Sequence, residues 1–175
     1  LINTKGVLLL LDAFKDLSRN PNLQTARLHL VGDGLLLSEI KSFIRKNKLS
    51  DSIILHGWVD DESKLDSILR SSDVLVVPST SFQSEGVPRV IEEALTRNVP
   101  VVATSVGGTS YEFTNNEIYL IEPDSVSEIR FAVEEILINK SVRDKYLRFC
   151  KKRTDRWTKM GSPTAQHSQI ILGKC

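Results

Sequence analysis

Five short apolar runs, each followed by a segment of helical character, constrain the fold of this 175-residue chain more than any other feature. The runs lie at residues 27–31, 53–55, 73–77, 99–103 and 118–121, and their first residues are 19 to 26 positions apart. Strands that alternate with helices form βαβ units, which give a parallel sheet covered on both faces. The sequence therefore predicts an α/β fold with a doubly wound, Rossmann-like parallel sheet.

The remaining segments carry apolar residues at helical spacing, and the expected helices include residues 6–20, 35–47, 61–70, 125–139 and 142–157. Another helix follows residue 77. Pro88 suits its first turn, where a missing N–H has no intrahelical partner, and Asn98 suits its end in a left-handed conformation. Residues 161–175 show no clear period. We therefore expect one domain over residues 1–159 and a tail, or a short terminal helix, over residues 160–175.

Composition limits the class of protein. The chain is 41% hydrophobic and 26% charged, enough for one sizeable core. A formal net charge of +1, with basic residues interleaved among acids nearly everywhere, favours neither nucleic acid nor an anionic membrane as partner. Only Lys151-Lys152-Arg153 forms a basic run, which suits a solvated face of a terminal helix. Cys150 and Cys175 form no disulfide framework and fit a reducing, cytoplasmic location. No apolar segment approaches the ~20 residues that span a bilayer, and we expect no signal peptide.

Glycine-rich or polar clusters follow four of the expected strands, at residues 32–34, 57–58, 79–86 and 104–108. The carboxyl ends of parallel strands share one edge, and ligands of such sheets bind there. The helix after residues 79–86 also points its positive N-terminal end at this edge, which attracts anions and phosphate above all. A single glycine pair also serves ordinary turns, but the joint placement predicts one ligand site.

Metal binding is not expected. The chain has no Asp-x-Asp motif, its two cysteines are 25 positions apart, and His29, His56 and His167 lack the spacing of metal ligands. We expect His29 and His56 to be structural. A Ser-His-Asp hydrolase is also disfavoured, because no Gly-x-Ser-x-Gly sequence occurs.

The ordered motifs resemble those of retaining GT-B glycosyltransferases, and most closely glycosyltransferase family 4, the "glycosyl transferases group 1" domain. The resemblance covers about residues 3–157. Its motifs are Lys5-Gly6, Val31-Gly32-Asp33-Gly34, Gly57-Trp58-Val59, Pro78-Ser79, Glu85-Gly86 with Glu93-Ala94 at the E-x7-E spacing, Pro100-Val101-Val102-Ala103 and Gly107-Gly108. The E-x7-E spacing alone is weak evidence, whereas the ordered set is specific.

The resemblance implies the C-terminal, donor-binding half of a two-domain enzyme of hexosyltransferase type. Such an enzyme moves a sugar from a nucleotide-diphosphate sugar to an acceptor with retained anomeric configuration and needs no further cofactor. The family's acceptors include glycans, lipid-linked sugars and small glycosides. Membrane contact would depend on the N-terminal acceptor domain, which the chain does not include.

The resemblance also implies residue roles. Glu93 matches the acid that binds the ribose hydroxyls through charge-assisted hydrogen bonds, and Glu85 matches the acid near the donor sugar. Lys5 matches the lysine that neutralises the diphosphate, the main electrostatic task of this reaction. Catalytic roles therefore fall to Glu85 and Lys5. Donor-binding roles fall to Glu93, Gly86, Val87, Gly57, Trp58, Val59, Gly32 and Ser79, with the base received at residues 57–59 and the diphosphate or sugar at the backbone N–H groups of Gly86 and Val87.

Several residues have simpler interpretations. Glu92 competes with Glu93, because each flanks the apolar stripe of its helix and only the family spacing selects Glu93. Glu93 and Arg97 would also suit a surface i, i+4 ion pair. Trp58 suits a core aromatic, and Asp33 suits a turn or a helix cap.

Three departures from the family pattern matter. Pro88 stands where the family commonly has glycine and offers no N–H to a phosphate. Residues 109–112 replace a shorter sequence of the family, next to the expected pocket for the donor sugar. The strand expected before Lys5, with its arginine, is absent, so we expect this chain alone to bind nucleotide without turnover. Two alternatives stay open, a different GT-B enzyme such as a nucleotide-sugar epimerase, and a non-catalytic interaction module.

Overall fold

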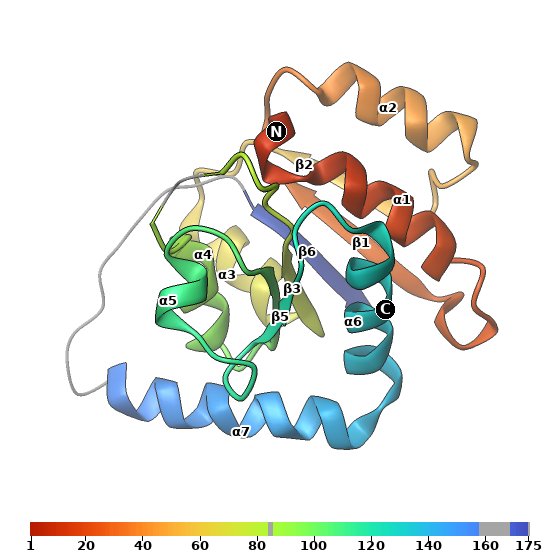
Figure 1. Ribbon diagram of the computed structural model, residues 1–175. Coiled ribbons are helices and arrows are strands. Elements are labelled where there is room, and N and C mark those ends of the chain that lie inside the picture. The colour runs from red at the N-terminus through yellow and green to blue at the C-terminus, as the bar shows by residue number, and fades with distance from the viewer. Residues whose placement is uncertain (84–85, 158–168, 175) are drawn as a thin grey trace.

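The structure is a computed structural model that describes residues 1–83, 86–157 and 169–174 (Figure 1). Its six-stranded sheet has the order β2-β1-β6-β3-β4-β5. The pairs β1–β2, β3–β4 and β4–β5 are parallel. The strands are β1 Ala26–Val31, β2 Ile53–Gly57, β3 Val74–Val77, β4 Val101–Thr104, β5 Tyr119–Ile121 and β6 Gln169–Lys174. All five strands expected from the sequence are present, and the α/β fold is confirmed.

The sixth strand corrects the expectation for the C-terminus. Residues 169–174 form neither a tail nor a helix, but a strand that lies antiparallel between β1 and β3 (Figure 1). The backbone N–H and C=O groups of β1 and β3 that face each other across this position need hydrogen-bonding partners, and β6 supplies them. The sheet is therefore mixed rather than purely parallel.

Helices cover both faces of the sheet (Figure 1). Side chains of β3 alternate between two apolar clusters, with Val74 and Val76 in one and Leu75 in the other. The first cluster includes residues of α1 Val7–Leu17, α2 Leu37–Lys46 and α6 Val126–Ile138. The second includes residues of α3 Glu62–Arg70, α4 Arg89–Leu95 and α7 Lys140–Trp157. Short helices at η1 Asn3–Lys5, η2 Pro21–Leu23 and α5 Thr109–Glu112 complete the chain.

The ends of α4 follow the sequence in part. Asn98 has a φ of 60°, as expected for a residue that closes a helix in the left-handed region. Pro88 does not lie in the first turn, however. It is the N-cap, with an extended ψ of 121°, and the helix begins at Arg89. An N-cap residue has non-helical dihedrals while its carbonyl already accepts a helical bond, and Pro88 O accepts from Ile91 N.

Candidate functional site

The loops that follow the parallel strands meet at one edge of the sheet, which we call the rim. The loops after β1 and β2 are joined directly, because Gly32 N–H donates to Gly57 O at 2.7 Å. Gly32 has a φ of 120° and Gly57 a φ of 66°. Residues other than glycine rarely adopt positive φ values. Two of the expected donor-binding residues are thus brought together through the backbone.

Trp58 lies on this rim with 54% of its surface exposed. The interpretation as a core aromatic is therefore wrong. Its neighbour Val59 packs against the second apolar cluster, which anchors the segment. An exposed indole beside an anchored backbone offers a flat apolar surface to a ligand.

The loop that carries Lys5 is fixed against the loop after β3. Thr80 N–H donates to Thr4 O at 2.9 Å. Gly6, with φ of 66°, packs so closely that a Cβ built on it would lie 1.8 Å from Pro78 O. The structure therefore brings Lys5 next to the segment that leads to Glu85.

Ser79 is 2% exposed, and its Oγ has no hydrogen-bonding partner in the part of the chain that the structure describes. A buried hydroxyl without a partner is uncommon in folded proteins. The backbone around it is held by Thr104, whose Oγ1 donates to Ser79 O at 2.7 Å. Asp124, which follows β5, also accepts from Ser81 N–H at 3.3 Å.

Gly108 packs against the start of the α4 segment. A Cβ built on Gly108 would lie 2.7 Å from Val87 N and 2.8 Å from Gly86 C. A Cβ on Gly86 would meet no atom within 4 Å among the described residues beyond its chain neighbours, so the described part of the chain leaves that side of the residue uncovered. The rim thus also joins the loops that follow β3 and β4. Glu85 lies outside the described residues, as do His167 and Cys175, so its placement stays a prediction.

The structure shows what Glu92 contacts. Glu92 forms an ion pair with Arg153 of α7, which also donates to Glu112 at 3.1 Å. The hydrogen bond to Glu92 is the main cause that raises the pKa of Arg153. Glu92 therefore holds α7 against α4, and the choice of Glu93 for the ribose still rests on the spacing of the motif.

Arg97 and Asp33 both make contacts within the fold. Arg97 binds Asp66 of α3 through Nε at 2.7 Å and donates to the backbone carbonyl of Glu93 at 2.9 Å. The guanidinium thus joins two helices across the second core cluster. Asp33 accepts from Gly34 N–H at 2.7 Å, which is the behaviour of a turn residue.

His29 and His56 satisfy each other. Nδ1 of His29 lies 2.9 Å from Nε2 of His56, and the two rings are stacked with centroids 5.1 Å apart. Burial lowers the pKa of both residues. The pair lies on adjacent strands directly before Gly57, and its arrangement confirms the structural interpretation.

Sequence reasoning missed Thr4 and Asp124 as supports of the rim. The signal for Asp124 was available, because it follows the fifth strand at the same edge as the other clusters. Thr80 and Thr104 lie in two of the predicted clusters, but their bonds join residues 76 and 25 positions apart and were not predicted.

The described residues show neither a membrane-spanning helix nor a cluster of metal ligands. None of the described helices combines the length and apolarity that a membrane span requires. Within the same residues, no three side chains of His, Cys, Asp or Glu gather where they could ligate a metal ion.

The chain is similar to known glycosyltransferases. The family described as "Glycosyl transferases group 1" matches residues 1–154. The chain is 34% identical over 140 residues to an uncharacterized glycosyltransferase of Methanocaldococcus jannaschii, which covers 79% of this chain and 36% of that protein. It is 32% identical over 133 residues to the putative teichuronic acid biosynthesis glycosyltransferase TuaC of Bacillus subtilis, covering 76% and 30%. The chain thus spans about a third of the length of these relatives.

Solved structures share the fold. HepE of Anabaena, in complex with UDP and glucose, has a TM-score of 0.72 and 23% identity, and the match covers 89% of this chain and 41% of HepE. The C-terminal domain of the glycosyl transferase group 1 protein LpcC of Francisella tularensis has a TM-score of 0.71 and 19% identity, covering 92% and 83%. With a GT-B fold and a family match over most of its length, the chain belongs to the glycosyl transferases group 1 family.

Proposed function

We propose that residues 1–157 are the nucleotide-sugar-binding domain of a retaining glycosyltransferase of family 4. The observation that carries the proposal is the fixed placement of Lys5. The hydrogen bond from Thr80 to Thr4, and the packing of Gly6 on Pro78, hold this cation beside the loop that leads to Glu85. A cation at this edge of the sheet meets the diphosphate of a donor and stabilises the charge that develops as it departs.

The resemblance to the family and the geometry of the rim support the other roles. Glu93 binds the ribose hydroxyls, because it matches the second acid of the E-x7-E motif. The backbone at Gly86 is open on one side and meets the diphosphate or the sugar. The Oγ of Ser79 has no partner among the described residues and supplies a further hydrogen bond on this side of the rim. Glu85 lies near the donor sugar, and the base lies at residues 57–59.

The donor is a nucleotide-diphosphate sugar, with UDP as the first nucleotide to test. HepE and the TarM protein of S. aureus, which share the fold, were solved with UDP. The acceptor is a glycan, a lipid-linked sugar or a small glycoside, and the other domain of the enzyme binds it. This chain binds the donor without transferring its sugar.

Thermal unfolding with UDP, GDP and ADP tests the proposal. A ligand at ten times its dissociation constant stabilises the folded state by about 1.4 kcal/mol, or roughly 3 to 6 °C for a chain of this size. We expect one nucleotide to raise the melting temperature of the wild type and to leave that of Glu93→Ala unchanged. Glu92→Ala is the matched control, which melts at a lower temperature but keeps the full nucleotide-induced shift.

The outcomes separate the alternatives. If the nucleotide-induced shift in melting temperature remained in Glu93→Ala and disappeared in Glu92→Ala, the ribose would bind Glu92 and not Glu93. The absence of a shift with any nucleotide, in a folded protein, would favour a non-catalytic interaction module. Sugar epimerisation by the full-length enzyme without any acceptor would favour a nucleotide-sugar epimerase.

A further inference from the structure

Charge is distributed very unevenly between α7 and the rest of the chain. The helix carries eight of the 23 basic residues and two of the 22 acidic residues. The other elements together therefore hold 15 basic and 20 acidic residues and are net acidic. The formal net charge of +1 conceals a strongly basic helix on an acidic body.

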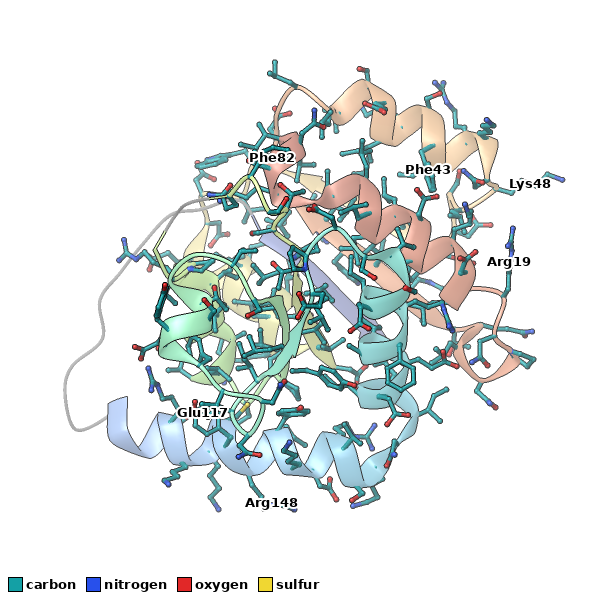
Figure 2. All side chains as sticks on the ribbon, in the orientation of Figure 1. Arg19, Phe43, Lys48, Phe82, Glu117 and Arg148 are labelled. Carbon is teal, nitrogen blue, oxygen red and sulfur yellow. The ribbon has the colours of Figure 1, made fainter. Side chains whose placement is uncertain are left out.

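Three exposed cations of α7 gather on its solvent side. Arg148, Lys151 and Lys152 are exposed, and none of them forms a side-chain hydrogen bond or ion pair in the described parts of the chain, although the charge of Arg148 contributes to lowering the pKa of Asp144. At 100° per residue they fall within an arc of about 100°. Figure 2 shows Arg148 extending from α7 away from the body of the protein. We call these three residues the basic face.

Other cations of α7 are engaged elsewhere. Arg153 binds Glu92 and Glu112, and Lys145 donates to Asn115 O at 2.7 Å. Lys140 pairs with Asp144 one turn along the helix. The basic face therefore consists of the exposed cations that form no hydrogen bond or ion pair among the side chains described for residues 140–154.

Apolar side chains are exposed next to this helix. Phe131 and Ile138, seven positions apart on α6, are 52% and 44% exposed. Residues at this spacing lie on one side of a helix. Ile138 is the last residue of α6, and α7 begins two positions later (Figure 1). Exposed apolar groups thus continue directly into a basic helix.

We propose that the basic face of α7, with Phe131 and Ile138, docks on an anionic lipid bilayer. Basic residues near an anionic bilayer each contribute to binding, and apolar side chains at the boundary of the headgroups add to it. α7 is 18 residues long, about 27 Å, and packs on α4 and α6. A straight, firmly held row of cations fits a flat charged surface.

Nucleic acid fits this surface less well. Single strands bind where bases stack on aromatic side chains, and no large apolar side chain of α7 is exposed among the described residues. The basic face is also remote from the rim, because Phe82 and Arg148 lie on opposite sides of the molecule (Figure 2). The proposal is therefore independent of donor binding, and a bound bilayer leaves the rim accessible.

Co-sedimentation with lipid vesicles tests the proposal. We expect the complete chain to bind vesicles with about one third phosphatidylglycerol, and to bind neutral phosphatidylcholine vesicles far more weakly. The triple variant Arg148→Gln/Lys151→Gln/Lys152→Gln should weaken binding about a hundredfold, since each cation near the surface contributes about fivefold. A double variant, Phe131→Ser/Ile138→Ser, should lose the binding that remains at high salt, where charges are screened.

The matched control neutralises three exposed cations of α2, as Lys41→Gln/Arg45→Gln/Lys46→Gln. It changes the net charge equally and should keep its affinity for vesicles within a few fold. If the two triple variants lost the same affinity for vesicles, net charge alone would explain the attraction and the proposal would be overturned. Equal binding to anionic and neutral vesicles would also overturn it. So would tight binding of a single-stranded oligonucleotide by a chain that does not sediment with vesicles.

Discussion

The rim and the α7 side of the molecule are held together by different interactions. At the rim, contacts are made by the backbone, as between Gly32 and Gly57 and between Gly6 and Pro78. On the α7 side, long charged side chains make the contacts, as Arg153 does with Glu92 and Glu112. A backbone contact leaves no room for a side chain, whereas an ion pair between side chains can rearrange. The rim should therefore tolerate substitution least.

The difference also suits what each side is proposed to bind. Glycines at positive φ bring the backbone close to a small anionic donor and fix the loops before it arrives. The α7 side offers charges at the ends of flexible side chains, which suits a surface without fixed geometry. The following changes test this contrast, in order of expected effect.

Gly6→Ala should have the largest effect. Its Cβ would lie 1.8 Å from Pro78 O, and its φ of 66° is unfavourable for alanine. The left-handed conformation costs about 1–2 kcal/mol and the overlap adds a similar amount, so about 3 kcal/mol in total. Calorimetry should show a melting temperature lower by about 6 to 12 °C, together with loss of the nucleotide-induced shift.

Gly57→Ala is the matched control for this change. It has the same φ of 66°, but within the described ranges its Cβ would meet no atom closer than 4 Å. Its free energy of unfolding should fall only by the cost of the left-handed conformation, about 1–2 kcal/mol. Equal losses in the two variants would mean that close packing at Pro78 contributes nothing, and the rim would then differ from the α7 side in backbone conformation alone.

Arg153→Met should have an intermediate effect. The side chains of Arg153 and Glu92 are only 14% and 16% exposed, so the change leaves a nearly buried carboxylate without its partner. We expect a loss of about 2 kcal/mol in the free energy of unfolding. The nucleotide-induced shift should remain, because neither Arg153 nor Glu92 is one of the proposed donor-binding residues.

Two comparisons sharpen this result. Lys152→Met removes a neighbouring exposed cation without a partner and should change stability by less than about 0.5 kcal/mol. In the double variant Arg153→Met/Glu92→Gln, part of the lost stability should return, because no unpaired charge is left. Stability losses that simply add would indicate that Arg153 acts through packing and not through Glu92.

The sequence predicted the five parallel strands because each combines a short apolar run with turn residues at its ends. It did not predict β6, since residues 169–174 show no alternation and the strand is defined by partners about 100 and 140 positions away. The ion pair of Glu92 likewise depends on Arg153, 61 positions further along. Local patterns specify elements, whereas long-range pairing decides which contacts the side chains make.

The basic face of α7 was predicted only in part. The sequence shows the basic run Lys151-Lys152-Arg153, interpreted as a solvated helix face, whereas Asp144 and Asp155 make the other basic residues of this helix look interleaved. On the helix surface, Arg148, Lys151 and Lys152 face one side, and the fold directs Arg153 toward Glu92. A helical projection of residues 140–157 would have revealed the cluster from the sequence.

The His29–His56 pair should have the smallest effect, and it tests whether the rim side responds to pH. Burial lowers the pKa of both residues below the usual 6.5. Between the lowered values and 6.5 the unfolded chain binds more protons than the folded one, so stability rises with pH. We therefore expect the melting temperature to fall on acidification from pH 7.5 toward pH 5, in addition to any general drift. His29→Gln/His56→Gln should flatten this dependence, whereas the ion pair of Arg153 should not contribute to it, because the pKa of Arg153 is raised and that guanidinium stays charged. A slope that persists in the double variant would place the pH response on the charged α7 side and reverse the contrast between the two regions.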